Sequence, residues 1–109
     1  MGGKASRRKG AGFERDLAKR WRDNGLFPEA KRGLMQSRCA REAPDVEGTP
    51  YWVEAKCGKK PRLYAAFDQA AAATDGRPLL VVAKRDRKET VVVMRLEDFE
   101  ALVLESDHL

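Results

Sequence analysis

The sequence has little of what disulfide frameworks, zinc sites and membrane spans are built from. It contains two cysteines and one histidine among 109 residues. These are too few for a disulfide framework, and they supply too few ligands for a structural zinc site. No apolar run approaches the ~18 residues of a transmembrane helix, and no apolar segment follows the basic N-terminus as in a secretory signal. We therefore expect a reduced, cytoplasmic protein that does not associate with membranes.

What the sequence has in excess is charge. Lysine and arginine total 22 against 17 acidic residues, and charged residues make up 36% of the chain, above the usual quarter. The formal net charge of +5 favours a polyanionic partner such as nucleic acid or anionic lipid, although a merely soluble basic domain would have the same charge. The length and the 42% of hydrophobic residues allow one domain with a modest core.

The first part of the chain predicts a flexible tail followed by a helix. Residues 1–11 are glycine, lysine, arginine, serine and alanine apart from the first methionine, which is typical of a disordered basic tail. From about residue 12 to residue 24, apolar side chains recur every four positions, as on one face of a helix: Phe13, Leu17 and Trp21. Gly25 should end this helix. We expect a tail over residues 1–11 and one folded domain over residues 12–109.

The rest of the domain predicts strands and helices in alternation. The expected elements are an edge strand, a hairpin, an alanine-rich helix, two strands and a last helix, over residues 26–33, 43–56, 62–74, 79–83, 91–94 and 96–104. The apolar run 79–83 is typical of a strand buried on both faces. The last helix should turn four apolar side chains inward: Leu96, Phe99, Leu102 and Val103. This order favours an α/β fold in which helices flank one mixed β-sheet.

One acidic residue falls within the apolar stripe of the first helix. At about 100° per residue, Glu14 lies between Trp21 and Ala18, inside the stripe, whereas most of the other charged side chains lie on the other side. An unpaired charge in that position is costly. Glu14 therefore forms a buried ion pair, lies at the edge of the stripe, or belongs to a functional site.

The predicted hairpin carries a second group of charged residues. Side chains alternate along a strand, so Trp52, Glu54 and Lys56 should share one face. If the turn centres on residues 48 and 49, Asp45 lies opposite Trp52 on that face, and Glu54 is its diagonal neighbour at about 7–8 Å between Cα atoms. A slip of one residue would move Asp45 to the other face.

Two carboxylates and a lysine in this arrangement suit metal-assisted phosphate chemistry. A cation of the Mg²⁺ type prefers carboxylate oxygens, with water and phosphate completing its shell. It can polarise a phosphate and acidify a water molecule, and a neighbouring ammonium can orient that water or stabilise the developing charge. Glu-x-Lys alone is also common on ordinary exposed strand faces.

Together these residues resemble the PD-(D/E)XK nuclease superfamily. The matching residues are Pro44-Asp45 followed by Glu54-Ala55-Lys56. Within the superfamily, the chain is most similar to the archaeal-type Holliday junction resolvases, which also occur in phages. The similar features are Glu14-Arg15-Asp16-Leu17 on the first helix, Gln69 on the alanine-rich helix and the apolar run 79–83.

The resemblance implies a restriction-endonuclease-like fold with Mg²⁺ or Mn²⁺ bound by Asp45, Glu54 and the Ala55 carbonyl. Glu14 would lie beside them, as an outer-shell group or a ligand of a second ion, and Lys56 would position the attacking water. The resemblance also implies a homodimer that resolves four-way DNA junctions, each subunit cutting one strand. Exposed apolar residues of the last two helices, including Phe67, are candidates for the dimer interface or simply for the core.

Basic and polar residues of the tail and loops are candidates for contacts with DNA, because most protein–DNA affinity comes from phosphate contacts. These candidates are Arg7, Arg8, Lys9, Arg32, Ser37, Arg38, Lys59, Lys60 and Gln69.

Two other functions fit the same residues. A nicking or restriction-like nuclease of the superfamily would share the site but cut a different DNA. A non-catalytic DNA-binding module would need only the cations. Carboxylates oppose phosphate unless a cation intervenes, so the set of acidic residues favours a nuclease.

Overall fold

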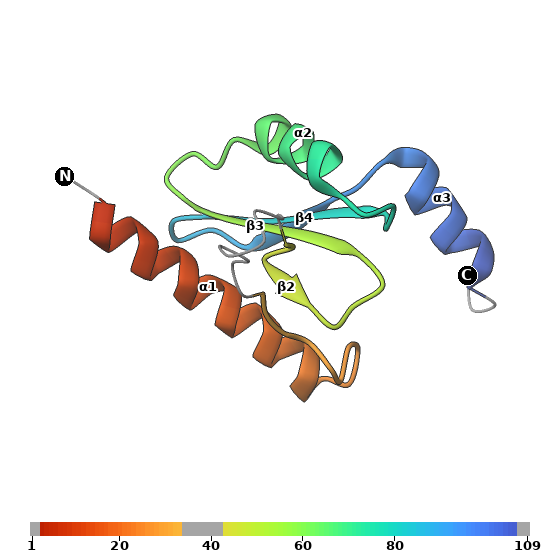
Figure 1. The fold of residues 1–109 in the computed structure, drawn as a ribbon, viewed down its shortest axis with the longest axis horizontal. Coiled ribbons are helices and arrows are strands. Elements are labelled where there is room, and N and C mark those ends of the chain that lie inside the picture. Colours follow the sequence, from red (N-terminus) through yellow and green to blue (C-terminus); the bar gives the residue numbers. More distant parts are fainter. Residues whose placement is uncertain (1–2, 34–42, 107–109) are drawn as a thin grey trace.

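The fold is a five-stranded mixed β-sheet with a helix on each face and a third helix beyond its edge (Figure 1). The computed structural model describes residues 3–33 and 43–106, with side chains from Lys9 onward. The strands are β1 (Lys31–Arg32), β2 (Val46–Glu47), β3 (Trp52–Gly58), β4 (Leu79–Arg85) and β5 (Thr90–Val93). They lie in the order β1-β2-β3-β4-β5, with β3 and β4 parallel and the other pairs antiparallel. The predicted α/β fold around one mixed sheet is therefore confirmed.

Helix α1 (Gly3–Asp23) crosses one face of the sheet (Figure 1). Leu17 and Trp21 of its apolar stripe are buried against Val53 and Val82 of the sheet. The helix ends just before Gly25, whose φ of 79° suits glycine, so the predicted end is correct.

The predicted start of this helix is wrong. The helix begins at Gly3 rather than near residue 12, so residues 3–11, expected to be a flexible tail, are helical. Alanine, lysine and arginine in this segment are strong helix formers. An ion pair between Lys9 and Asp86 also ties this part of the helix to the far end of β4.

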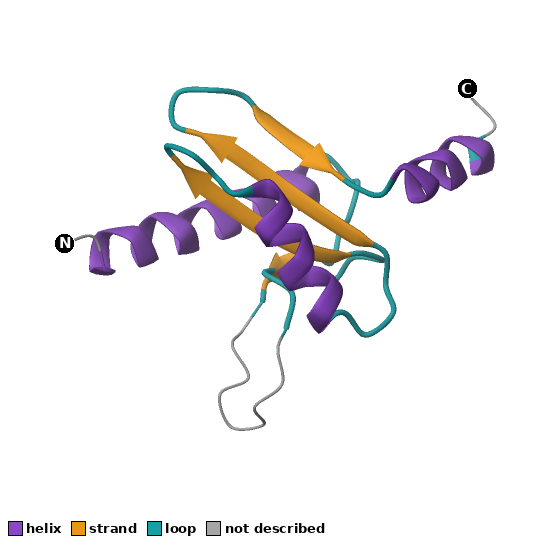
Figure 2. Ribbon diagram, turned by 90° about the horizontal axis from the view of Figure 1, so that it is seen from above, coloured by secondary structure: helices purple, strands orange, loops and turns teal. Residues whose placement is uncertain are grey.

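Helix α2 (Leu63–Ala73) covers the opposite face and connects the parallel strands β3 and β4 (Figures 1 and 2). Such a crossover is required because parallel neighbours cannot be joined by a tight turn. Its small Ala70 side chain allows close packing and forms a second buried cluster with Trp52 and Leu79. Every residue from Leu79 to Ala83 is buried, which confirms the prediction of a strand covered on both faces.

Helix α3 (Leu96–Glu105) does not pack on the sheet as predicted. It has no buried residue, and Leu96, Phe99 and Leu102 are all exposed. The helix follows β5 past the edge of the sheet and points away from it (Figure 2). Its apolar face therefore remains uncovered by any other described part of the chain. Among the helices that the structure describes, none is long and apolar enough to cross a lipid bilayer.

Candidate active site

Strand β3 carries Glu54 and Lys56 on the face that α2 covers. Alternation places both on the side of Trp52, which packs against Ala70 of α2. The Glu54 side chain is buried, and the Lys56 ammonium lies 3.6 Å from its Oε2. Lys56 Nζ also donates a hydrogen bond to Gln69 Oε1 on α2 at 3.4 Å. Trp52, Glu54 and Lys56 therefore share one strand face, as the alternation predicts.

Asp45 lies immediately before β2 and is bonded twice to the backbone of β3. Its N–H donates to the Val53 carbonyl at 2.7 Å. Its Oδ2 accepts a hydrogen bond from the Ala55 N–H at 2.8 Å. These two bonds reach the residues on either side of Glu54. The Asp45 carboxylate is thus held against β3 beside Glu54, its predicted neighbour.

The register of β2 and β3 differs from the predicted one. Val46 lies opposite Val53, so the predicted pairing of Asp45 with Trp52 is wrong. The connection between the strands is longer than the expected turn at residues 48 and 49. Within this longer connection, the Thr49 hydroxyl accepts a hydrogen bond from the Tyr51 N–H at 3.0 Å.

Glu14 of α1 forms an ion pair with Arg32 of β1. Its Oε1 accepts a hydrogen bond from Arg32 Nε at 2.9 Å, and the Glu14 side chain is only 17% exposed. Burial raises the pKa of Glu14, the Arg32 guanidinium lowers it, and the negative charge of Asp45 raises it further. Glu14 therefore does form an ion pair, but the pair is only partly buried, because the Arg32 side chain is 42% exposed.

Asp45 belongs to the same electrostatic cluster. Burial raises the pKa of Asp45, whereas the hydrogen bond from Ala55 and the positive charges of Lys56 and Arg32 lower it. Glu14 and Asp45 thus both have raised pKa values, and the same two cations oppose both shifts. An additional cation beside these carboxylates would favour their ionised forms.

The donor set fits a hard divalent cation. Asp45 and Glu54 offer carboxylate oxygens and Ala55 offers a carbonyl, which suit Mg²⁺ or Mn²⁺ when water and phosphate complete the shell. Within residues 3–33 and 43–106, no three or more histidine, cysteine, aspartate or glutamate side chains converge closely enough to hold a metal. Glu14, the possible further ligand, is bonded to Arg32. The protein alone therefore offers a partial coordination shell.

The candidates for DNA contact fall into three groups. Three lie exposed on the surface: Lys59, Lys60 and Gln69. Lys9 and Arg32 are also exposed, but they form ion pairs with Asp86 and Glu14. Four lie outside the residues or side chains that the structure describes: Arg7, Arg8, Ser37 and Arg38.

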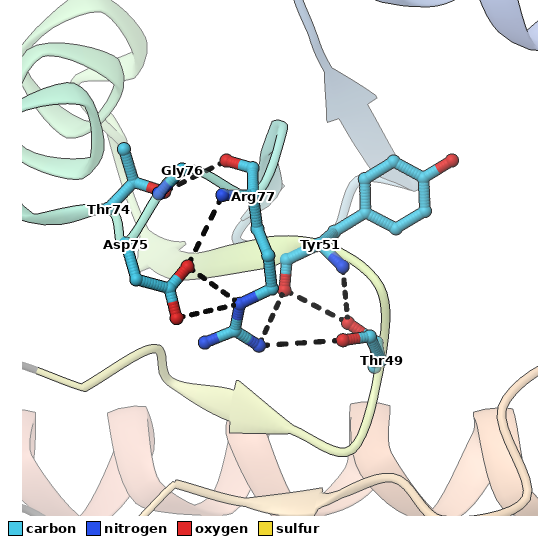
Figure 3. Close-up of polar contacts among 6 residues, drawn as sticks. All are labelled: Thr49, Tyr51, Thr74, Asp75, Gly76 and Arg77. Atoms are coloured by element: carbon cyan, nitrogen blue, oxygen red, sulfur yellow. Dashed lines mark hydrogen bonds and ion pairs between the residues drawn. The ribbon is translucent and has the colours of Figure 1, made fainter.

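Contacts around Arg77 hold the start of β3, and no pattern in the sequence indicates them (Figure 3). Arg77 Nε donates to Asp75 Oδ1 at 3.0 Å, and Nη1 donates to the carbonyls of Thr49 and Tyr51 at 3.4 and 3.5 Å. The guanidinium also lies over the Trp52 ring, 5.3 Å from its centroid. These contacts fix the turn that leads into the strand carrying Glu54. Only the three-dimensional structure brings them together.

This arrangement can support hydrolysis of a phosphodiester. Asp45 and Glu54 can bind a cation that contacts a phosphate, and the Lys56 ammonium can orient water or stabilise negative charge. Gln69 holds that ammonium from α2. Comparison of the chain with known protein families, curated proteins and solved structures finds no match.

Proposed function

We propose that this protein is a metal-dependent DNA endonuclease of the PD-(D/E)XK type. The observation that carries the proposal is the hydrogen bond between the Asp45 carboxylate and the N–H of Ala55, the residue between Glu54 and Lys56. This bond holds the aspartate against the segment of β3 on which Glu54 and Lys56 form an ion pair at 3.6 Å. A DNA strand can approach such an acidic region only if a cation lies between them.

In this proposal, Asp45, Glu54 and the Ala55 carbonyl would hold Mg²⁺ or Mn²⁺. The bound ion would polarise the scissile phosphate and make water more acidic. Lys56 orients the attacking water and stabilises negative charge on the phosphate, and Gln69 positions the Lys56 ammonium. Glu14 belongs to the same charged cluster, since the negative charge of Asp45 raises the pKa of Glu14.

The order of elements supports a restriction-endonuclease-like fold for this nuclease. A helix with Glu14 comes first, Asp45 precedes β2, and Glu54 and Lys56 lie on β3. An alanine-rich helix with Gln69 and an apolar strand follow. The resolvases that the sequence resembles have the same order.

We propose a four-way DNA junction as the substrate, cut by a homodimer in the cytoplasm. The uncovered face of α3 supports a second subunit, since Phe99 and Leu102 are 51% and 45% exposed. Beside this helix, a groove of about 620 Å³ is lined by further apolar side chains, including Tyr64 and Phe67. Contiguous exposed apolar surface of this kind is typical of interfaces. A dimer would bring two sites to one junction.

Cleavage of labelled synthetic DNA tests the proposal. The substrates are a four-way junction, a duplex and a single strand, each with Mg²⁺ or with EDTA. We expect paired symmetric nicks in the junction only, and only with the metal. Equal cutting of all three substrates would refute junction specificity, and no cutting with any divalent metal would favour the DNA-binding module. Gel filtration that gives only monomer, with and without junction, would contradict paired cutting.

A single substitution tests the site itself. Glu54→Gln removes one carboxylate charge and should abolish cleavage while DNA binding is kept or strengthened. Glu29→Gln, at an exposed glutamate in the loop before β1, is the matched control and should cut at the normal rate. A fully active Glu54→Gln variant would end the assignment of the site.

A further inference from the structure

Six cations lie at one end of the sheet, on two loops and on the last residue of β4. Because β3 and β4 are parallel, their C-terminal ends and the loops that follow them lie at the same edge (Figures 1 and 2). Gly58 is paired with Arg85, and the Asp86 N–H donates to the Gly58 carbonyl at 2.8 Å, which ties the two loops together. We call their exposed side chains the basic ridge: Lys59, Lys60, Arg62, Arg85, Arg87 and Lys88.

The charges of the basic ridge are available to a ligand. None of the six forms an ion pair with a carboxylate in the described part of the chain. Asp86, in the same turn, is already paired with Lys9, so the exposed Glu89 is the remaining acidic neighbour in the turn. A hollow of about 240 Å³ lies between the two loops and is lined in part by Arg85 and Lys88.

The tip of the β4–β5 turn is strained. Arg87 has a φ of 62° and is the only non-glycine residue with positive φ among those described. An L side chain in this conformation is unfavourable, and glycine would avoid the penalty. Strain of this kind concentrates at functional sites. The turn thus presents a cation where the backbone alone would favour glycine.

The basic ridge begins close to the proposed active site. Lys56 is paired with Ala83, and Arg85 follows two residues later on the same face of β4. Two residues of strand span about 7 Å. Measured along the axis of a DNA helix, one strand presents a phosphate every ~3.4 Å, so a length of about 7 Å along that axis corresponds to about two base pairs.

We infer that the basic ridge binds the phosphate backbone of the DNA strand next to the bond that is cut. This inference rests on the proposed nuclease function, and it adds the β4–β5 turn to the DNA interface. An anionic membrane is the other polyanion to consider, but membrane-binding surfaces combine cations with exposed apolar side chains. Of the exposed large apolar residues in the described part of the chain, Val91 alone lines the hollow beside the ridge, which favours nucleic acid.

Salt-dependent binding of the full chain to a labelled four-way junction tests the inference. Fluorescence anisotropy in EDTA measures affinity without cleavage. The variant Arg85→Gln/Arg87→Gln/Lys88→Gln should bind roughly tenfold more weakly near 100 mM KCl, and the slope of log affinity against log salt should fall by about two to three. The control Arg15→Gln/Lys19→Gln/Arg20→Gln removes the same charge from exposed positions of α1. It should change affinity less than about threefold.

Arg87→Gly separates DNA contact from local structure. Glycine relieves the positive φ, so the melting temperature should stay the same or rise while DNA affinity falls. An unchanged salt slope in the triple variant, or equal weakening by the α1 control, would overturn the inference. The inference would also be overturned if the triple variant lost binding to phosphatidylserine vesicles but kept its full affinity for DNA.

The same experiments separate this inference from the proposed function. If the wild-type protein binds DNA through the basic ridge but never cuts it with Mg²⁺, the nuclease proposal is refuted and the inference about the basic ridge is kept. If the wild-type protein cuts DNA while the ridge variants bind DNA normally, the inference about the basic ridge is refuted and the nuclease proposal is kept. Absence of DNA binding by the wild-type chain would refute both.

Discussion

The Lys56 ammonium lies 3.6 Å from the Glu54 carboxylate, and the two side chains differ sharply in exposure, at 37% and 6%. The carboxylate is enclosed by the sheet and α2, whereas the ammonium reaches solvent. Attraction between opposite charges is stronger where one of them is shielded from water. The pair therefore connects a buried anion with a position that a phosphate can reach.

Replacing the lysine tests this relationship. Lys56→Met keeps the length of the side chain but removes its charge, so single-turnover cleavage should fall by about 100-fold or more. The free energy of unfolding in urea should fall by only about 1 kcal/mol, because the partly exposed ammonium is screened by solvent. Lys84→Met, at the next lysine of the sheet, should keep normal cleavage. Normal cleavage by Lys56→Met would exclude a role for this ammonium.

The stability of the metal-free protein should increase as the pH falls towards the raised pKa values of Glu14 and Asp45. Burial raises the pKa of Glu14 above 4.5 and that of Asp45 above 3.8. Between those ordinary values and the raised ones, the folded protein holds protons that the unfolded chain has released. The free energy of unfolding therefore decreases as the pH rises through this interval.

Urea unfolding at several pH values measures this effect. The double variant Glu14→Gln/Asp45→Asn removes both groups and should lose most of the slope over the same interval. Asp75 and Asp86 have lowered pKa values because they are paired with Arg77 and Lys9, so they act in the opposite direction and only at more acid pH. A wild-type slope equal to that of the double variant would contradict the prediction.

Gly48 and Gly25 form a matched pair for a test of backbone packing. Their φ angles are 83° and 79°, but an added Cβ at Gly48 would lie 2.0 Å from the Glu29 carbonyl oxygen, whereas at Gly25 it would meet open space. Gly25→Ala should cost about 1–2 kcal/mol for the left-handed backbone alone. Gly48→Ala should cost more than about 3 kcal/mol in urea unfolding. Equal losses would mean that the Glu29 backbone moves away freely.

Arg77 should contribute more to the free energy of unfolding than other arginines at the surface. Arg77→Ala removes the bonds to the Thr49–Tyr51 turn and the contact with the Trp52 ring. It should lower the free energy of unfolding by about 1–3 kcal/mol. Arg15→Ala, at an exposed position of α1, should change it by less than about 0.5 kcal/mol. Similar losses in both variants would contradict the assigned contacts.

The parts of the fold that the sequence predicts correctly depend on local pattern. The repeat of Leu17 and Trp21 identifies the buried side of α1, and the run 79–83 identifies the central strand. Side-chain alternation alone brings Glu54 and Lys56 to one face. The position of α3 could not be predicted in this way, because an amphipathic pattern identifies a face suited to burial but not the surface that covers it.

The rest of the site depends on contacts between distant segments. The Thr49 hydroxyl and the Arg77 guanidinium determine the connection between β2 and β3, and neither leaves a periodic signal. The ion pair of Glu14 with Arg32 joins residues 18 positions apart, on elements whose relative placement no local pattern fixes. The sequence could therefore predict that Glu14 is partly buried, but not which cation it meets.

Helix α1 is synthesised before the strands that it packs against. Trp21 and Leu17 lie against Val82 in the core, and Lys9 is paired with a residue 77 positions further on. On the ribosome, this apolar stripe must wait until β4 emerges before it can be covered. The sheet has to assemble before the helix docks, and such long-range pairing slows folding. A nascent chain that ends before β4 should expose Trp21 to water and to chaperones.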